Sequence, residues 1–154
     1  MLPNVTTARL RDQLSNFEAL FSPGGQEAWD KKPSSAKWSA RENLAHLGRY
    51  HEILLDRVRK ILKEDRPQFA RYGAEGDREW LSWSSLPVRI VQERIRELRS
   101  ELITLLDTLG EPQLQRTGSH PVLGEITLLQ WLEFFLLHEA HHLYAILFRL
   151  CEPI

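Results

Sequence analysis

One long segment near the end of the chain, from Thr127 to about Leu150, is apolar around most of the circumference of an α-helix. Such a helix has no wide polar face to turn toward water, so it has to pack against several neighbours. The segment opens with Thr127-Leu-Leu-Gln130, a capping-box pattern that favours a helix start at this point. We therefore expect a central helix that other helices surround.

Three further segments repeat apolar residues at three- and four-residue steps, which is the period of an α-helix. They cover residues from about 5 to 21, from 39 to before 67, and from about 85 to before 110. Strand signals are weak everywhere. The four segments together predict an all-α four-helix bundle. A length of 154 residues suits one domain, so we expect residues 1–154 to form a single bundle domain.

Signals at the ends of these segments define their limits. Ser22-Pro-Gly-Gly is expected to stop the first helix. Ser39 and Glu42 predict a capping box at the start of the second helix, in which each side chain accepts a hydrogen bond from the backbone N–H of the other. Gly110 is suited to a left-handed cap at the end of the third helix.

Two connections between the helices are long. Residues 66–85 contain four aromatic side chains, which favours packing as a cover across one end of the bundle over a mobile substrate lid. Residues 110–126 contain His120-Pro121 and Gly124, and we expect them to form a packed, turn-rich segment.

Charge and cysteine content narrow the classes of function. The formal net charge of −1 leaves no basic surplus to neutralise phosphates, so nucleic acid is not an expected partner. The longest apolar-rich run, residues 128–137, is interrupted by Gln130 and Glu133 and is far shorter than the ~20 residues of a membrane span. A single cysteine, Cys151, and an N-terminus without the features of a secretory signal indicate the cytoplasm.

The histidines carry the clearest chemical signal. The string His138-Glu-Ala-His-His142 places His138 and His142 four residues apart, on the same face of the last helix. Both imidazoles can bind one metal ion at about 2.0–2.1 Å. Their flanks are apolar, and buried imidazoles without partners cost about 1–3 kcal/mol per group. We therefore favour a metal site over a hydrogen-bonded core pair.

The same string also matches H-E-x-x-H, the metalloprotease pattern in which Glu139 would be the general base. Such enzymes usually take a third ligand from farther along the chain. Only Cys151 and Glu152 are available there, close to the end of the same helix. A protease is therefore not expected, and a third ligand has to come from an earlier segment.

His46, His51 and His120 are the candidates for that third ligand. His51 falls near the middle of the apolar stripe of the second helix, where it can be an inward ligand or a hydrogen-bonded core residue. His46 lies at the edge of that stripe, and His120 lies on a predicted loop that could line the same cavity. Helical periodicity alone does not choose among the three.

The arrangement resembles the DinB-like/YfiT-like superfamily of bacterial metal-binding bundles. The motifs that carry the resemblance stand in the family's order and spacing, and they are Trp38-Ser39-x-x-Glu42-x-x-x-His46-Leu47, His120-Pro-Val-Leu-Gly124 and Leu-His138-Glu-Ala-His-His142. The resemblance implies that His46, His138 and His142 are metal ligands, and it implies no ligand role for His51 or His141. It also implies crossed connectivity, a site at one end of the bundle and frequent homodimers.

The resemblance implies an open metal site, in which the protein does not fill every coordination position of the metal. Three protein ligands leave positions for water or substrate, as in catalytic sites. We expect one divalent transition metal, zinc or nickel ahead of iron or manganese, although imidazoles bind all four. Similarity to the family implies a metal-dependent enzyme that activates a low-molecular-weight thiol for transfer or isomerisation on a small molecule. The alternatives are a non-catalytic or stress-related metal-binding bundle and a metal-dependent small-molecule hydrolase.

Other polar residues near the expected ligands have two explanations each, and the sequence assigns no catalytic residue. Glu42 and Tyr50 lie one turn before and after the second-helix histidine and could support it, but capping already accounts for Glu42. Glu139 points about 100° away from its neighbouring ligand and is expected beside the ligands or at the surface. Arg49 and Arg149 could bind a substrate carboxylate, although solvated surface arginines are more common.

Overall fold

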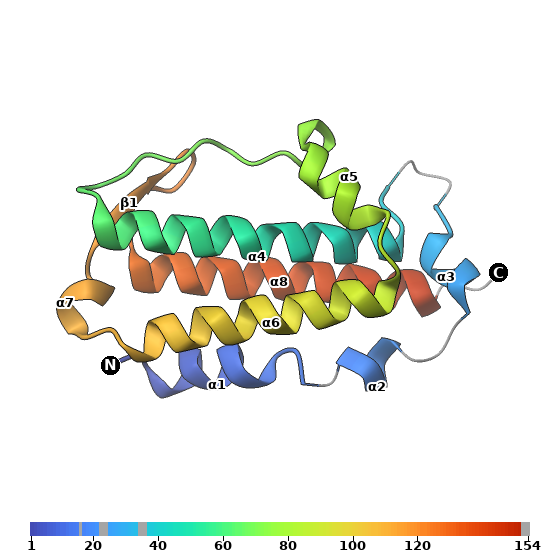
Figure 1. Ribbon diagram of the computed structural model, residues 1–154, viewed down its shortest axis with the longest axis horizontal. Coiled ribbons are helices and arrows are strands. Elements are labelled where there is room, and N and C mark those ends of the chain that lie inside the picture. Colours follow the sequence, from blue (N-terminus) through green and yellow to red (C-terminus); the bar gives the residue numbers. More distant parts are fainter. Residues whose placement is uncertain (16, 22–24, 34–36, 152–154) are drawn as a thin grey trace.

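Within residues 1–15, 17–21, 25–33 and 37–151, which the computed structural model describes, helices lie side by side as a four-helix bundle (Figure 1). The bundle consists of α1 (Asn4–Asp12) followed by α2 (Phe17–Phe21), α4 (Ala40–Lys63), α6 (Val88–Asp107) and α8 (Leu128–Cys151). The predicted bundle fold is therefore confirmed. None of the described helices is long and apolar enough to cross a membrane.

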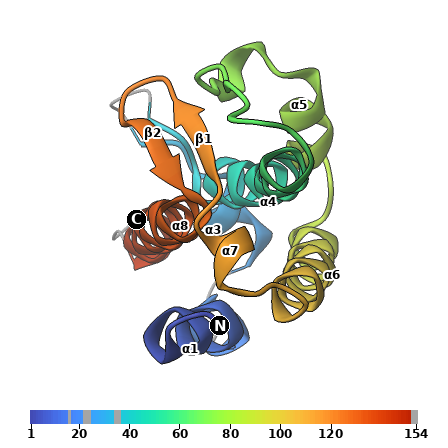
Figure 2. The same cartoon turned by 90° about the vertical axis from the view of Figure 1, so that its left-hand side faces the viewer.

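Helices that follow one another in the chain are not all neighbours in the bundle. α4 packs between α8 and α6, and α1 packs between the same two helices on the opposite side (Figure 2). The steps from α1 to α4 and from α6 to α8 therefore cross the bundle. Residues 64–87 run back along the bundle, so that α4 and α6 point in the same direction (Figure 1). The expected crossed connectivity is present.

Local sequence fixes where α4 begins and how closely its neighbours approach. The Ser39 hydroxyl accepts a hydrogen bond from the Glu42 N–H, and the Glu42 carboxylate accepts one from the Ser39 N–H, so the predicted capping box is confirmed. Gly48 faces the ring of Trp83, and a Cβ at this position would lie 2.3 Å from it. The absence of a side chain lets α5 (Arg78–Ser84) lie directly against α4.

The first long connection packs on the bundle as a cover. It contains η1 (Ala74–Gly76) and α5, and α5 packs against α4 (Figure 1). Trp80 and Trp83 of α5 are buried, and Trp80 stacks on Trp38 with 5.3 Å between ring centroids. The predicted packing is confirmed, but the cover follows the length of α4 instead of crossing one end of the bundle.

The second long connection contains a hairpin, for which the sequence gives only weak signals. After α7 (Glu111–Leu114), β1 (Thr117–His120) pairs antiparallel with β2 (Gly124–Thr127). Gly124 adopts a φ of 73°, a left-handed conformation that glycine tolerates without strain. Strands of four residues are too short to show a clear alternation, which explains the weak signal.

Two predicted helix boundaries are corrected by the structure. The first helix breaks after Asp12, where the Ser15 hydroxyl donates to the Asp12 carbonyl. Gly110 is extended (φ −93°, ψ 176°) rather than left-handed, because it is the N-cap residue that precedes α7. Residues 22–24 of the predicted stop lie outside the described residues, and Gly25 is an extended residue that precedes α3 (Gln26–Asp30).

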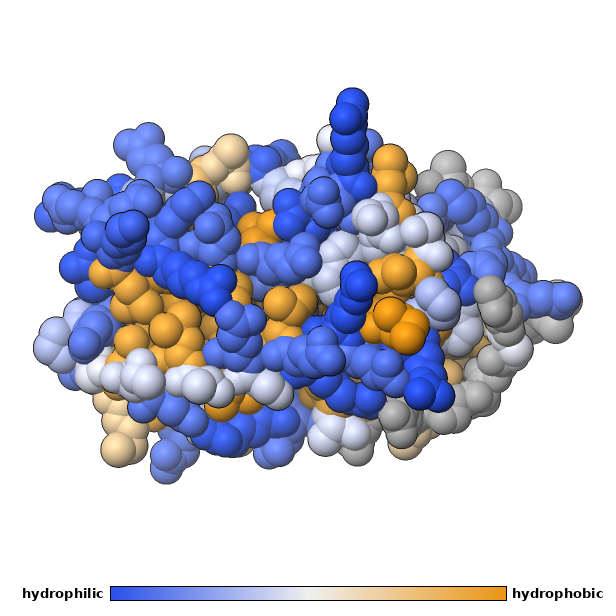
Figure 3. Space-filling model, viewed as in Figure 1, coloured by the Kyte–Doolittle hydropathy of each residue, from blue (hydrophilic) through white to orange (hydrophobic). Residues whose placement is uncertain are grey.

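Only one side of α8 is buried in the core of the bundle. Its side chains that face the core, such as Leu132 and Phe135, are fully buried. Leu137, Tyr144 and Phe148 lie on the outer side and are 64%, 66% and 50% exposed. Figure 3 shows the side of the molecule on which α6 lies nearest the viewer, and this side is mostly polar with patches of apolar side chains. The prediction that other helices surround the last helix is therefore only partly correct, because an apolar stripe on α8 is exposed to solvent.

Candidate metal centre

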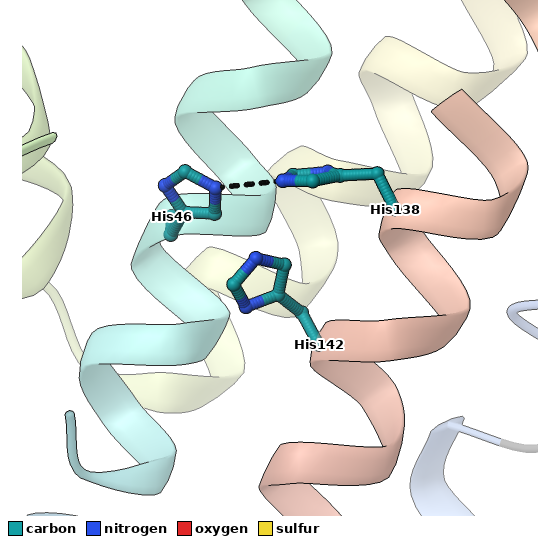
Figure 4. A group of neighbouring side chains, drawn as sticks. All are labelled: His46, His138 and His142. Carbon is teal, nitrogen blue, oxygen red and sulfur yellow. Dashed lines mark hydrogen bonds between the residues drawn. The ribbon is translucent and has the colours of Figure 1, made fainter. Parts of the chain in front are cut away.

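Three imidazoles from two helices meet where α4 and α8 pack together (Figure 4). His46 comes from the second turn of α4, and His138 and His142 come from the middle of α8. One ring nitrogen of each residue lies within 4.8 Å of the other two. The structure therefore brings together the three histidines that the family resemblance implies.

The spacing of the ring nitrogens suits a single metal ion. His46 Nε2 and His138 Nε2 are 3.0 Å apart. Two nitrogens that each lie about 2.0–2.1 Å from one ion, at an angle of about 90–110°, are about 2.9–3.4 Å apart. These two side chains therefore need little rearrangement to share an ion.

Asn43 fixes the protonation of the His142 ring. Its Nδ2 amide donates to the Ser39 carbonyl at 2.8 Å and to the Trp38 carbonyl at 3.4 Å, which leaves Oδ1 as the acceptor. His142 Nδ1 lies 2.8 Å from that oxygen and therefore carries the proton. The unprotonated Nε2 faces the other two rings (Figure 4). An outer partner that orients a histidine in this way is typical of metal sites.

The contact between His46 and His138 does not form a satisfied core pair. Only one N–H···N hydrogen bond can form between the two Nε2 atoms, and the buried Nδ1 atoms of both rings have no partner within the part of the chain that the structure describes. Each unpaired buried group costs about 1–3 kcal/mol. A metal ion bound by both Nε2 atoms would not pair the Nδ1 atoms, but it would replace one N–H···N hydrogen bond with two coordination bonds, so the donor set fits a metal better than it fits a structural histidine pair.

Burial keeps the three imidazoles neutral. It lowers the pKa of His46 to about 4. It also lowers the pKa of His138 to about 3 and that of His142 to about 2, and the neighbouring imidazoles add to both effects. Neutral imidazole is the form that binds metal ions. All three rings therefore offer lone pairs near neutral pH.

Aromatic rings enclose the cluster. Trp38 lies over two of the imidazoles, with ring centroids 5.0 and 6.0 Å away. Tyr72 stacks on His46 at 5.6 Å, and Tyr50 packs on His138 at 4.2 Å. Tyr50, which the sequence offers as a possible support for His46, contacts the cluster through its ring, while its hydroxyl accepts a hydrogen bond from Arg57. These rings limit the access of water, and electrostatic interactions are stronger in the resulting low-dielectric surroundings.

His51 belongs to a separate buried network. Its Nδ1 donates to the Leu47 carbonyl at 2.7 Å, and its Nε2 lies 3.1 Å from the Arg99 guanidinium. Arg99 also forms an ion pair with Glu139, which accepts a further hydrogen bond from Gln13 at 2.7 Å. Glu139 is fully buried, so the expectation that it lies at the surface or beside the ligands is wrong. His51 is the hydrogen-bonded core residue of the two alternatives.

The remaining candidates lie outside the cluster. His120 stands on β1 and accepts hydrogen bonds from backbone N–H groups of the hairpin loop, and His141 is exposed. Glu42 has the capping role that the sequence predicts. Arg49 is held by two carboxylates, and Arg149 donates to the Trp38 carbonyl at 3.3 Å.

Asn43 and Tyr72 have no role in the sequence-based interpretation. Asn43 precedes His46 by three residues and therefore shares its helix face, which is a signal that could have identified it. No sequence pattern predicts that Tyr72 stacks on His46, because this contact joins the long connection to α4 across the fold.

Comparison with known proteins gives a consistent family. A family model described as the DinB superfamily matches residues 9–146. A protein of Oceanobacillus iheyensis, provisionally named a metal-dependent hydrolase, is 28% identical, and the match covers 82% of this chain and 72% of that protein. YuaE of Bacillus subtilis is also 28% identical, with 76% of this chain and 80% of YuaE covered.

A solved structure shares the fold. YfiT from Bacillus subtilis is described as a probable metal-dependent hydrolase with an unusual four-helix bundle topology. It matches with a TM-score of 0.78 and 22% sequence identity, over 95% of this chain and 85% of that chain. The likeness supports the crossed bundle described above.

Proposed function

Because this chain belongs to the DinB superfamily, we propose that it is a metal-dependent enzyme for a small-molecule substrate. One divalent transition metal, zinc or nickel, is held by His46, His138 and His142. The observation that carries the proposal is the convergence of three neutral imidazoles whose ring nitrogens lie within 4.8 Å of one another. The names given to the Oceanobacillus iheyensis relative and to YfiT support a metal-dependent activity.

The residues of the chain prepare this site for a cation. A divalent ion supplies a Lewis acid that lowers the pKa of a coordinating thiol or water. Asn43 holds His142 with Nε2 facing the cluster, and burial keeps the ligands neutral. Three neutral ligands leave the full charge of a dication uncompensated, so the site attracts an anionic nucleophile. Trp38 and Tyr50 strengthen that attraction because they exclude water.

The leading chemistry is transfer or isomerisation with a low-molecular-weight thiol. Among the described residues, no carboxylate hydrogen-bonds to any of the three imidazoles. The full charge of a bound dication would therefore act on its nucleophile. A thiol that coordinates a metal loses its proton outright. This loss of the thiol proton supports a thiol as the nucleophile of the proposed reaction.

Hydrolysis of a small ester or amide is the second candidate, and the names of the relatives favour it. A non-catalytic metal-binding bundle is the third. The candidates share the metal and differ in turnover, so a test has to measure metal content first and two reactions afterwards.

Elemental analysis of the untagged protein, before and after chelation, tests the metal. We expect about one equivalent of zinc or nickel per chain, consistent with one three-histidine site. The reloaded protein is then assayed for conjugation of cysteine or glutathione to monobromobimane and, in parallel, for hydrolysis of p-nitrophenyl acetate. Chelation-sensitive conjugation supports the thiol enzyme, and chelation-sensitive ester turnover supports the hydrolase instead. Metal without turnover leaves the non-catalytic bundle, and absence of metal after reconstitution contradicts all three.

We also propose a homodimer, which the exposed stripe of Leu137, Tyr144 and Phe148 on α8 supports. A net charge of −1 does not keep two copies apart. Light scattering is expected to give twice the 18.0 kDa of one chain, and Phe148→Lys is expected to give the mass of one chain. A monomeric wild-type protein at tens of micromolar contradicts the proposal.

The cytoplasm is the proposed location. Cys151 is a free and exposed cysteine, which suits a reducing compartment. Fractionation of the source cells is expected to recover the protein with cytoplasmic markers, and recovery from the medium or an envelope fraction contradicts this location.

A further inference from the structure

A cleft of about 630 Å³ lies between α4 and the connection that follows it. One side is formed by α4 side chains between positions 49 and 57, and the other by residues of the segment 69–77. Tyr72 lines this cleft and also stacks on His46, so the cleft borders the histidine cluster without containing any of its three rings. No role in the proposed metal chemistry accounts for the cleft.

The carboxylates that line the cleft already have cationic partners. Arg49 binds Asp77 at 2.7 Å and Glu52 at 3.0 Å. Asp56 pairs with Lys60 at 2.8 Å. Among the described residues, none of these carboxylates forms an ion pair with Arg57 or Arg71.

Arg57 is a buried cation that lacks a carboxylate partner among the described residues. It lines the cleft and is only 7% exposed. It donates to the Tyr50 hydroxyl at 3.2 Å and to the Ala70 carbonyl at 3.1 Å, which uses two of its five N–H donors. The rings of Tyr50, Phe69 and Trp131 lie 5.2–5.8 Å from the guanidinium carbon and shield it from water. Arginine is almost never buried in this way without a counter-charge.

We propose that the cleft binds the oxyanion group of a small molecule, a carboxylate or a phosphate, on the guanidinium of Arg57. The planar guanidinium matches two oxygens of such a group at once. Exposed Arg71 adds a second positive charge to the same cleft. Phe69 and Tyr72 supply ring surfaces for an apolar body attached to the anion. The site is distinct from the proposed metal centre and does not require the metal.

The test is a titration of the ¹⁵N-labelled full chain with benzoate and with phenyl phosphate, followed by NMR. Each anion is compared with benzamide, which has a similar body and no charge. We expect saturable shifts of the backbone amides of residues 69–73 and of the Arg57 Nε–H, and benzamide at least about tenfold weaker. The tighter of the two anions identifies the oxyanion that the site prefers.

Variants locate the binding on Arg57. Arg57→Met removes the charge and keeps the aliphatic stem, and we expect it to weaken binding at least about tenfold. Arg59→Met makes the same change two residues away on α4, outside the cleft, and is expected to leave binding unchanged. If Arg57→Met does not fold, the comparison of Arg57→Lys with Arg59→Lys replaces it, because lysine keeps the charge but loses the two-pronged contact.

Three results overturn the proposal: no saturable shift at the cleft, equal binding of benzamide, or unchanged affinity in a folded Arg57 variant. The same titration on chelated protein separates this site from the metal centre. We expect identical affinities with and without metal, so a failure of the metal proposal leaves this one standing. An affinity that disappears on chelation contradicts an independent site.

Discussion

Imidazoles have two different kinds of surroundings in this chain, and the atoms around each ring determine which role it suits. Both nitrogens of His51 have protein partners, so this ring is satisfied within the core. His46 and His138 share one hydrogen bond between their Nε2 atoms, and their buried Nδ1 atoms find no partner among the described residues. The unsatisfied rings are therefore the ones that fit a metal ion.

Loss of a ligand histidine is the first prediction at this scale. His142→Ala removes one of three ligands, and we expect bound metal to fall from about one equivalent to a small fraction of it. Elemental analysis after dialysis measures this. His141→Ala, an exposed neighbour, and His51→Ala are the controls and are expected to keep the metal. Full occupancy in His142→Ala contradicts the ligand assignment.

Asn43 provides the second prediction. Asn43→Leu removes the acceptor that holds the His142 ring, and loss of such an outer partner typically lowers metal affinity about 10–100-fold. Competition with a chromophoric chelator measures the affinity. Asn43→Asp keeps an acceptor oxygen and is expected to bind at least as tightly as the wild type. Equal affinities for Asn43→Leu and the wild type show that Asn43 does not support the site.

At the scale of elements, a buried ion pair joins helices that are not neighbours in sequence. Arg99 of α6 binds Glu139 of α8, and both contact His51 of α4. Burial alone would raise the pKa of Glu139, but the hydrogen bond with His51 and the charge of Arg99 outweigh burial and hold this pKa at about 2. Glu139 therefore stays charged, and its contacts fix the rotation of α8 that turns His138 toward α4.

Breaking this pair gives the third prediction. Glu139→Gln leaves the Arg99 charge buried without a carboxylate, and we expect the free energy of unfolding to fall by about 3–5 kcal/mol. Urea denaturation measures the change. Glu101→Gln breaks the exposed pair with Arg59 and is expected to cost at most about 1 kcal/mol. Similar losses in the two variants would mean that the buried network does not stabilise the helix packing.

The helices and their capping signals follow from local sequence, but several of their limits do not. The Ser39–Glu42 capping box acts between residues three apart, so the sequence is sufficient to predict it. Gly110 is of the residue type that favours a left-handed helix C-cap, but it is instead the extended N-cap residue of α7. The start of α7, and not the glycine itself, determines the backbone conformation at this position.

For the whole molecule, the proposed metal links α4 to α8 and so stabilises the bundle. Binding to the folded state alone contributes about 2.7 kcal/mol when free metal is about 100 times the dissociation constant. For a chain of this size that corresponds to an increase of about 5–10 °C in melting temperature. Calorimetry of chelated and reloaded protein measures the shift. His142→Ala is expected to show none, and an equal shift in that variant would place the metal elsewhere.

The sequence by itself determines the helical period, the main capping box and the pairing of His138 with His142, because each depends on residues within one or two turns of a helix. It does not choose His46 over His51, because both lie on or beside the apolar stripe of one helix and differ in the segments that they face. The family resemblance supplied that choice. The tertiary structure decided the rest. Asn43, Tyr72, the Arg99–Glu139 pair and the Arg57 cleft all depend on contacts between segments far apart in the chain. The crossed path of the chain creates those contacts, and no local pattern of residues encodes them.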